Sequence, residues 1–316
     1  MTMPAIAMGL HAIIVAMGDG EPLVLCVPGG SGDPAIPALP SGPFDPTRDR
    51  TLESGLRRWV REQTDLSLGY VEQLYTFGDR GRQQAASLSD THFVSVGYLA
   101  LSPLPGDPDR HAWRSWYAHL PWEDWRHGRP SMIETEIRPA LLNWAAENDA
   151  DGQRIQRLCQ AFGETFTASN WADEGWDEER VLERYELIYE AGLVAEAVTD
   201  GRRDTVRSTQ PLGLAMLHDH RRMLATGIAR LRAKLKYRPV IFELMPRTFT
   251  LTQLQRTAEV LSGRNLHKQN FRRMVESSRL VEPTGKRMSQ TGGRPAMLYR
   301  FRKAVTQRHA YVGLRV

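Results

Sequence analysis

Hydrophobic and polar positions in the first third of the chain alternate mainly with the period of a β-strand. Residues 5–27 contain two apolar runs rich in β-branched side chains, separated by Gly-Asp-Gly-Glu, and this pattern predicts a β-hairpin. Residues 70–79 and 91–101 predict two further strands. The Gly- and Pro-rich stretch after the hairpin predicts a loop with one short strand near residues 35–39.

A single helical pattern interrupts these strands. Apolar side chains recur at helical spacing over residues 51–64, and Thr51 with Ser54 offers an N-terminal cap. Strands interrupted by one helix, with more helix after them, predict a mixed α/β sandwich. We assign residues 1–147 to this first domain.

The middle of the chain is predicted to be helical. Amphipathic patterns indicate helices over residues 130–148, 151–163 and 178–192. A longer helix is expected over 212–237, where the apolar positions are Leu217, Leu224, Ile228, Leu231 and Leu235. Such a stripe suits a connector or a dimer seam, and equally a core-facing helix of a single chain. We assign residues 148–236 to a helical connector and dimerisation region.

Residues 237–316 have the element order of a winged helix-turn-helix. Thr250 or Thr252 can cap a first helix, and Gly263 ends it. After a short turn, residues 266–281 supply a second helix. Apolar positions of this second helix can face a core, which leaves its polar and basic positions facing outward.

The basic side chains of this segment predict a DNA-reading surface. Arg, Lys, Gln and Asn are the side chains that meet base edges and phosphates. Two short strands over 280–283 and 296–301 enclose a flexible basic loop, the predicted wing, whose bases would neutralise phosphates. The candidate DNA-binding residues are Thr252, His267, Lys268, Gln269, Asn270, Arg272, Arg273, Lys286, Arg287 and Arg294.

Charge is divided very unevenly along the chain. The overall net charge is +4, but residues 221–316 hold 22 of the 41 Lys and Arg and only four of the 37 Asp and Glu. The segment is therefore near +18, and the remainder is near −14. This asymmetry indicates a polyanionic partner for the C-terminal third, and a double-stranded DNA operator is the expected one.

A second motif lies in the N-terminal domain. The segment from Gly42 to Leu66 follows the outline of a Nudix box, in which carboxylates on one helix face hold Mg²⁺ against a pyrophosphate. Arg58, Val60, Glu62 and Leu66 match that pattern. Its other acidic positions do not match: Trp59 and Gln63 stand where the box has Glu, and Asp65 replaces its Gly. One carboxylate holds a divalent metal poorly, so we expect no metal site and no hydrolysis.

The segments around this box extend the resemblance. Residues 71–82 and 91–101, together with 230–255, 270–285 and 292–301, resemble the Nudix-related transcriptional regulators of NAD metabolism, the NrtR-like repressors. The longer middle resembles their alphaproteobacterial, NadQ-like subgroup. This resemblance implies an α/β Nudix-like sandwich domain plus a C-terminal winged helix-turn-helix, joined by a helical connector. It also implies a homodimer that represses NAD biosynthesis or salvage genes.

The resemblance further implies a nucleotide effector. For the wider family that effector is ADP-ribose or NAD, and for the subgroup it is NAD(H) or ATP; no cofactor is required. In this sequence we expect ligand contacts from Arg58 and Glu62 at the former pyrophosphate site, and from Tyr75, Phe77, Asp79, Arg80 and Arg82 beyond it. For the two aromatic residues a place in the core is the stronger alternative, and the Asp79–Arg82 stretch is equally well a solvated turn.

Two other functions fit the sequence less well. A Nudix hydrolase of ADP-ribose or related nucleoside diphosphates is the alternative that the missing carboxylates disfavour. An RNA-binding interaction protein ranks last, because RNA readers use exposed aromatic residues or a Gly clamp, and the C-terminal segment offers few of the former and none of the latter. Cys26 and Cys159 lack partners at metal-ligand spacing and predict free thiols in a reducing cytoplasm. No apolar run predicts a membrane span.

Overall fold

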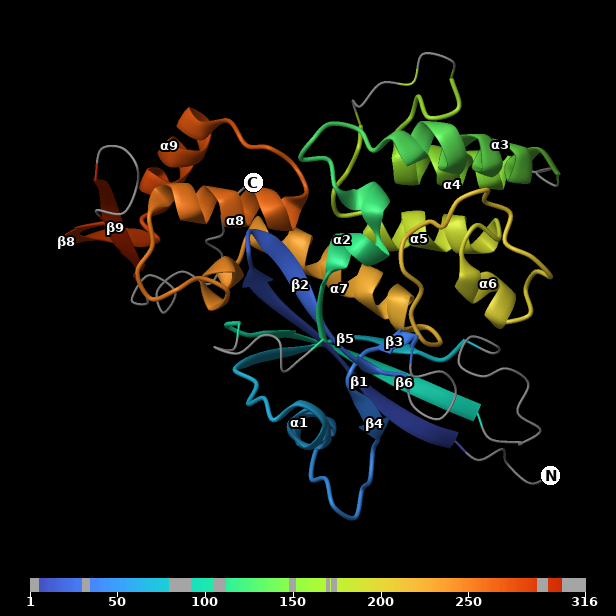
Figure 1. Cartoon of the computed structure of the whole chain (residues 1–316), viewed down its shortest axis with the longest axis horizontal. Coiled ribbons are helices and arrows are strands. Elements are labelled where there is room, and N and C mark those ends of the chain that lie inside the picture. The colour runs from blue at the N-terminus through green and yellow to red at the C-terminus, as the bar shows by residue number, and fades with distance from the viewer. Residues whose placement is uncertain are drawn as a thin grey trace.

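The computed structural model describes residues 6–29, 35–79, 92–104, 112–147, 152–168, 171, 175–288 and 295–302. Its centre is a mixed sheet of order β3-β2-β1-β6-β5, in which β1 and β6 run parallel (Figure 1). β4 pairs with β1, and β7 pairs with β2. The strands are β1 (Ile6–Gly18), β2 (Glu21–Pro28), β3 (Pro37–Ala38), β4 (Ser41–Pro43), β5 (Tyr70–Phe77), β6 (His92–Leu101) and β7 (Ala112–Ser115).

The predicted hairpin and strands are confirmed. β1 and β2 pair antiparallel around Asp19 and Gly20, whose positive φ angles of 49° and 77° suit a tight hairpin turn. Strand β1 buries side chains on both faces: Ile13 and Val15 join one core, and alternate residues such as Leu10 and Ile14 join the other. The two faces of the sheet are therefore covered by different elements.

Helix α1 (Leu52–Thr64) covers one face of the sheet, below it in Figure 1. Its predicted cap is present: the Thr51 side chain accepts from the Ser54 backbone N–H, and the Ser54 side chain accepts from the Thr51 N–H. Leu56 and Val60 bury the inner stripe of the helix against β1. This packing fixes the position of the helix that carries the Nudix-like motif.

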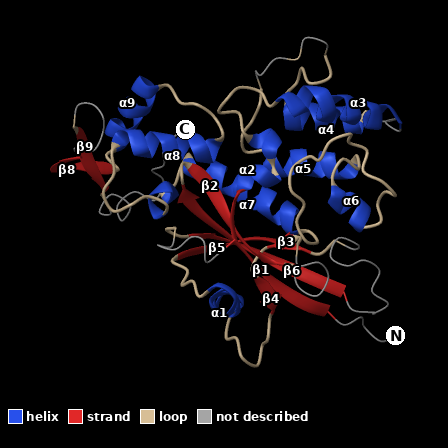
Figure 2. Cartoon of the chain, viewed as in Figure 1, coloured by secondary structure: helices blue, strands red, loops and turns tan. Residues whose placement is uncertain are grey.

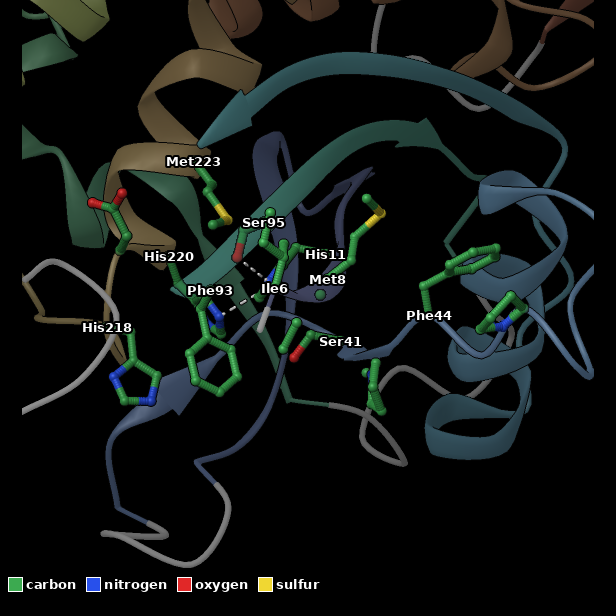
Figure 3. A pocket seen from close by; sticks show the side chains of 16 residues that line it. Ile6, Met8, His11, Ser41, Phe44, Phe93, Ser95, His218, His220 and Met223 are labelled. Atoms are coloured by element: carbon green, nitrogen blue, oxygen red, sulfur yellow. Dashed lines mark hydrogen bonds between the residues drawn. The ribbon is translucent and has the colours of Figure 1, made fainter. Parts of the chain in front are cut away.

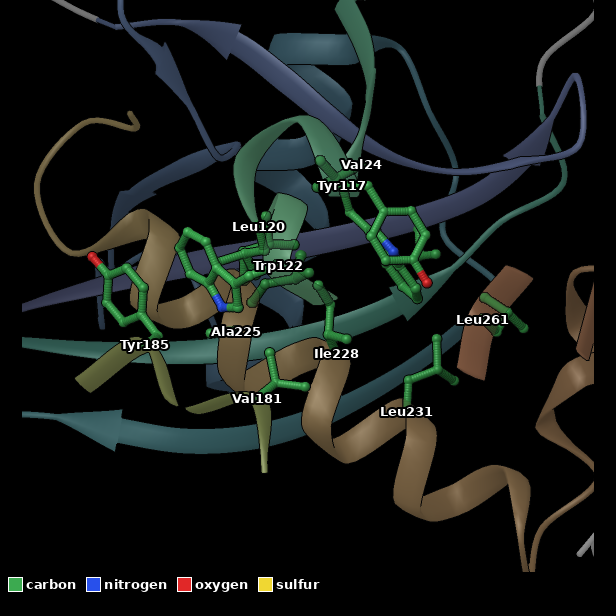
Figure 4. Packing of buried hydrophobic residues seen from close by; sticks show 14 of the residues in the cluster. Val24, Tyr117, Leu120, Trp122, Val181, Tyr185, Ala225, Ile228, Leu231 and Leu261 are labelled. Carbon is green, nitrogen blue, oxygen red and sulfur yellow. The ribbon is translucent and has the colours of Figure 1, made fainter. Parts of the chain in front are cut away.

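A helical layer covers the other face (Figure 2). Its centre is α7 (His220–Leu235), which contacts β1, β5 and β6 on one side and α5 (Val181–Glu190) on the other. Figure 4 shows Ala225, Ile228 and Leu231 of α7 within this core. The layer consists of α2 (Trp116–His119), the 3₁₀ turn η2 (Pro121–Glu123), the π-turn η3 (Ile133–Ile137), α3 (Arg138–Glu147), α4 (Gln153–Phe162), α5 (Val181–Glu190), α6 (Ala195–Thr199) and α7 (His220–Leu235).

The predicted helix over 212–237 is too long at its N-terminal end. Helix α7 begins only at His220, because Gly213 and His218 have left-handed φ angles of 75° and 48° that no α-helix accommodates. The apolar stripe from Leu224 to Leu235 is buried inside the chain. Of the two interpretations left open by the sequence, the core-facing helix is therefore confirmed for this stripe.

The C-terminal part has the predicted winged-helix order. A 3₁₀ turn, η4 (Val240–Glu243), leads to α8 (Leu251–Ser262), and α9 (Lys268–Ser278) follows. Thr250, not Thr252, caps α8, in a reciprocal capping box with Gln253. Strands β8 (Val281–Met288) and β9 (Ala296–Phe301) form the wing, and a backbone bridge from Phe249 to Tyr299 ties it to the start of α8.

One boundary in the wing was predicted wrongly. β8 continues to Met288, so Lys286 and Arg287 lie in the strand and not in the loop. A register shift between Pro283 and Arg287 bends the strand there, and such a bulge tolerates Gly and basic residues that a flat strand disfavours. Arg294 lies outside the described residues. No helix in the described part of the chain has the length and apolar character needed to cross a bilayer.

Candidate functional site

The start of α9 presents polar and basic side chains to solvent. Phe271 and Val275 bury the inner face of the helix, 3% and 0% exposed, so the opposite face is fixed outward. The N-cap residue His267 makes no side-chain cap, which leaves backbone N–H groups of the first turn without that partner. The exposed residues are His267, Lys268, Gln269, Asn270, Arg272 and Arg273.

The wing adds cations to the same domain. Lys286 and Arg287 of β8 are exposed, as is Thr252 on the first turn of α8. At the base of the wing, Glu282 is occupied by Arg300 and Arg302, at 2.7 and 3.0 Å. The Glu282 carboxylate therefore does not neutralise the two basic residues nearer the tip.

The Nudix-like helix holds its arginine in a closed ion pair. The Arg58 guanidinium donates to both oxygens of the buried Asp49, at 2.9 and 2.8 Å, and its Nη1 lies 3.4 Å from Glu62. Hydrogen bonds from Arg58 hold the pKa of the Asp49 carboxyl below its usual range. Arg58 and Glu62 were both expected to contact a pyrophosphate. In the structure they lie next to each other, and Arg58 is paired with Asp49.

Two uncharged side chains tie this helix to β4. Trp59 Nε1 donates to the Pro43 carbonyl at 2.8 Å. The Gln63 amide donates to the Ser41 carbonyl at 2.8 Å and accepts from the Ser41 N–H at 3.0 Å. A Cβ on Gly42 would lie 2.2 Å from the Trp59 ring, so the indole packs where only glycine leaves room. We call this contact the β4–α1 clamp.

The remaining ligand candidates fall in different environments. Phe77 is 1% exposed and belongs to the core, whereas Tyr75 is 58% exposed, with the two rings edge to face at 5.2 Å. Asp79 pairs with Arg222 of α7 at 2.5 Å and borders a charged recess of about 460 Å³ against α4 and α5. The irregularity between Gln73 and Thr76 explains why two odd-numbered aromatic residues differ in exposure. Arg80 and Arg82 lie outside the described residues.

A larger pocket, which the sequence did not reveal, opens at one end of the sheet. It has a volume of about 720 Å³ and is built from the start of β1, from residues 41–46, from the start of β6 and from residues 218–223 (Figure 3). Met8, Phe44, Phe93 and Met223 line it with apolar groups. Of the expected ligand residues that the structure describes, Arg58, Glu62, Tyr75, Phe77 and Asp79, none lines this pocket, which we call the effector pocket.

A chain of hydrogen bonds joins two of the pocket's histidines, His11 and His220. The Leu39 N–H donates to Nδ1 of His220 at 2.9 Å, so the proton of neutral His220 is on Nε2. That nitrogen lies 3.1 Å from Nδ1 of His11, and Nε2 of His11 lies 2.8 Å from the Ser95 hydroxyl (Figure 3). Burial, with a smaller contribution from His218, lowers the pKa of His11 to about 4. Burial also holds the pKa of His220 well below its usual range.

The far end of α7 is held by a buried ionic cluster. Glu123 accepts from Arg184 of α5 at 2.7 and 2.8 Å and from Arg232 of α7 at 2.8 Å, and all three side chains are 0% exposed. Burial alone would raise the pKa of the Glu123 carboxyl, but the two guanidinium groups hold it below its usual range. We call this set the ionic joint.

The ionic joint also contacts α8, the first helix of the winged domain. Arg232 Nε donates to the Leu261 carbonyl at 3.0 Å, and the Tyr117 hydroxyl donates to the Val260 carbonyl at 2.7 Å. Gly263, at the end of α8, has φ 75°, and a Cβ there would lie 2.5 Å from the Glu123 carbonyl oxygen. Helix α7 thus borders the pocket at its N-terminal end and contacts α8 near its C-terminal end.

Comparison with known proteins agrees with this arrangement. Residues 241–301 match the family described as NrtR DNA-binding winged helix domain. The ADPR responsive transcriptional repressor NtrR of Acinetobacter baylyi is 44% identical over 92 residues, which cover 29% of this chain. The chain spans about a third, 36%, of the length of that curated relative.

Solved structures with the same fold cover nearly the whole chain. Shewanella oneidensis NrtR, solved with a 27mer DNA, is 22% identical with a TM-score of 0.53, over 98% of each chain. A MutT/nudix family protein of Enterococcus faecalis is 15% identical with a TM-score of 0.51, over 94% of this chain and 86% of its own. The chain therefore shares the fold of these proteins, an α/β domain followed by a winged helix, and its residues 241–301 are similar to the NrtR winged-helix family.

Proposed function

We propose that this protein is a DNA-binding transcriptional repressor controlled by a nucleotide. The observation that carries the proposal is the exposed basic face at the start of α9, with the cations of the wing beside it. Recognition helices of winged domains use this position to reach the major groove, where Arg, Gln and Asn discriminate base edges. A wing that carries cations adds phosphate contacts.

The relatives support the regulatory part of the proposal. The Acinetobacter relative is named as ADPR responsive, and Shewanella NrtR was solved with DNA. We propose ADP-ribose as the first effector to test, with NAD(H) and ATP as alternatives, and NAD biosynthesis or salvage genes as targets. We further propose a cytoplasmic homodimer on operator DNA, organised as residues 1–147, 148–236 and 237–316, and the two free cysteines fit a reducing compartment.

The effector pocket and the ionic joint give this regulation a physical route. His220 and Met223 of α7 line the pocket, and Arg232 of the same helix contacts α8. A ligand that favours one position of α7 would shift the populations of two arrangements of the winged helix. In this proposal, α7 couples ligand binding in the pocket to the position of the winged helix, because the same helix contacts both.

Hydrolysis is not part of the proposal, because the Nudix-like helix does not fit a metal. Trp59 and Gln63 occupy the positions of two Nudix carboxylates, and both are engaged in the β4–α1 clamp. Among the described residues, no three His, Cys, Asp or Glu side chains converge so that they could hold a metal ion. Incubation with Mg²⁺ and ADP-ribose should release no nucleoside monophosphate, and its release would restore the hydrolase as the better interpretation.

Fluorescence anisotropy with operator DNA tests the DNA-reading face. Arg272→Ala or Arg273→Ala should cost roughly 1–3 kcal/mol of operator affinity where the side chain meets a base edge. Lys286→Ala with Arg287→Ala should weaken binding to all sequences and flatten its dependence on salt. Arg57→Ala, on the distant helix α1, is the matched control. Unchanged binding by all the α9 and wing variants would refute the assignment of the reader.

A further inference from the structure

Four acidic residues lie in the basic segment 221–316, and two of them have structural partners. Glu259 accepts from a side-chain amide at 2.9 Å and from a backbone N–H at 3.0 Å, around the turn that follows α8. Glu282 is paired with two arginines at the base of the wing. Glu243 and Glu276 are exposed, and neither forms an ion pair within the described part of the chain. Internal pairing therefore does not explain why Glu276 is acidic.

Glu276 lies on the face of α9 that is turned to solvent. Phe271 and Val275 bury the opposite face of the helix. An α-helix turns by about 100° per residue, so Gln269, Arg273 and Glu276 lie within about 60° of one another on the outer side. All three side chains are exposed, and α9 lies at the edge of the molecule (Figure 1). The predicted reading face therefore contains a stripe of one amide, one cation and one carboxylate.

A carboxylate in this stripe is unfavourable for binding to the DNA backbone. Duplex DNA carries one negative charge for about every 1.7 Å of its axis, so Glu276 lowers the affinity for DNA of every sequence. In the major groove, however, cytosine presents an amino donor, from which a carboxylate accepts. Adenine also presents an amino group, but its N7 acceptor lies beside that group and repels a carboxylate. The base that Glu276 fits best is therefore cytosine.

The spacing of the three residues suits the spacing of base pairs. Gln269, Arg273 and Glu276 are separated by four and then three positions. The helices of C₂H₂ zinc fingers, which have an unrelated fold, read three successive bases with residues at the same intervals. Seven residues of helix rise by about 10.5 Å, and three base pairs occupy about 10 Å. A helix that lies along the major groove therefore brings each residue of the stripe to a different base pair.

We propose that Gln269, Arg273 and Glu276 read three successive base pairs, and that Glu276 selects cytosine. Glutamine pairs with the N6 and N7 groups of adenine, and arginine pairs with the O6 and N7 groups of guanine. Arg272, on the flank of the stripe, contacts phosphate. The inference rests on the proposed function, because it takes α9 to be the recognition helix. It adds Glu276, which is absent from the DNA-binding residues expected from the sequence, as a residue that determines specificity.

Selection of bound duplexes from a random-sequence DNA library by the full chain tests this inference. The parent chain should enrich a motif in which one position read by α9 is cytosine. Glu276→Gln should replace that cytosine by adenine, and Glu276→Ala should accept any base there. For two duplexes that differ only at this position, the ratio of affinities should change by about 5-fold or more in Glu276→Gln, the lower end of what one good base contact contributes. The rest of the motif should stay the same.

The lost charge gives an independent readout. Glu276→Gln should bind a duplex that lacks the motif more tightly than the parent chain does, because one repulsion from phosphates is removed. Fluorescence anisotropy with that duplex measures the difference. Weaker binding of this duplex by the folded variant would overturn the inference, because a residue that only supports the fold of α9 would weaken binding to all DNA when it is replaced.

The neighbouring arginines test the order of the stripe. Arg273→Ala should lose a preference for guanine at the position next to the cytosine. Arg272→Ala should weaken binding to all duplexes and keep the motif, because a phosphate contact carries no sequence information. The opposite result for the two variants would overturn the assignment of the stripe.

Glu243→Gln is the matched control for Glu276→Gln. It removes the same charge from an exposed residue outside α9, in the turn η4, and should leave the motif unchanged. Circular dichroism confirms that both variants are folded. The same motif for the parent chain and for folded Glu276→Gln would overturn the inference and leave the proposed function intact. A parent chain that enriches no motif would overturn both.

Discussion

Helix α7 meets two different environments at its ends. Its N-terminal end borders a cavity, and His220 there hydrogen-bonds to the neutral His11. Its C-terminal end is enclosed, and Arg232 lies in a fully buried cluster with Glu123 and Arg184. Ion pairs hold both ends, because Arg221 pairs with Glu196 and Arg222 pairs with Asp79 and Asp219 near the N-terminus of α7. The two ends differ in that the N-terminal end has open space on its pocket side, whereas the ionic joint is enclosed and permits few geometries. The pocket end of α7 therefore has more room to change position than the enclosed end at the ionic joint.

Breaking the ionic joint should have the largest effect. Glu123→Gln keeps the size of the side chain but leaves two buried guanidinium groups without a counter-charge. We expect the free energy of unfolding to fall by roughly 3–5 kcal/mol, measured by urea denaturation. Glu62→Gln, in the half-exposed pair with Arg58, is the control and should cost less than about 1 kcal/mol. Equal effects from the two variants would remove the contrast between the joint and ordinary surface pairs.

Acid should act on the pocket end with a somewhat smaller effect. Because the pKa of His11 falls from 6.5 to about 4 on folding, the unfolded chain takes up the proton first as pH decreases. The stability contributed by neutral His11 is therefore present above pH 6.5 and lost between pH 6.5 and 4, amounting to about 3 kcal/mol. His119, with its pKa also lowered to about 4 by burial, adds to the same window.

Two variants isolate the contribution of His11. His11→Gln should reduce the slope of unfolding free energy against pH between 6.5 and 4, while part of the slope remains because of His119 and His220. His127→Gln, at an exposed position, is the control. A slope in His11→Gln equal to that of the parent would show that the pocket histidines do not resist protonation.

The smallest effect is expected from reshaping the pocket wall. Met223→Leu conserves volume and polarity, so the free energy of unfolding should change by less than about 1.5 kcal/mol. Because the side chain lines the effector pocket, the affinity for ADP-ribose measured by calorimetry should nevertheless change. A large loss of stability with unchanged binding would show that this end of α7 is as rigidly packed as the other.

The elements of the winged helix were predictable because their signals are local. Thr250 and Gln253 cap α8 from three residues apart, and Gly263 ends it. The exposed face of α9 followed from the spacing of its apolar residues. The length of β8 could not be predicted from the sequence. Lys286 and Arg287 are residue types that are uncommon in strands, and their place in β8 depends on pairing with β9.

The pocket could not be predicted, because it is assembled by tertiary structure. His11 and His220 are 209 positions apart in the chain, and neither lies in a motif. The expectation for Arg58 followed from the Nudix-like pattern, but a pattern does not reveal that buried Asp49 engages both sides of the guanidinium. His11 within an apolar strand, and the spacing of His218 and His220, were the only local signs of the site that the sequence contained.

Strand β1 has a consequence for how the gene can change. Its odd-numbered residues face the core beneath α7, and its even-numbered residues face the core above α1. Deleting or inserting one codon here would exchange the two sets, so Ile13 would meet α1 and Ile14 would meet α7, and both cores would be mispacked at once. Substitutions between similar apolar residues would be tolerated far better. Natural variation in this strand should therefore consist of amino-acid replacements and almost never of changes in length.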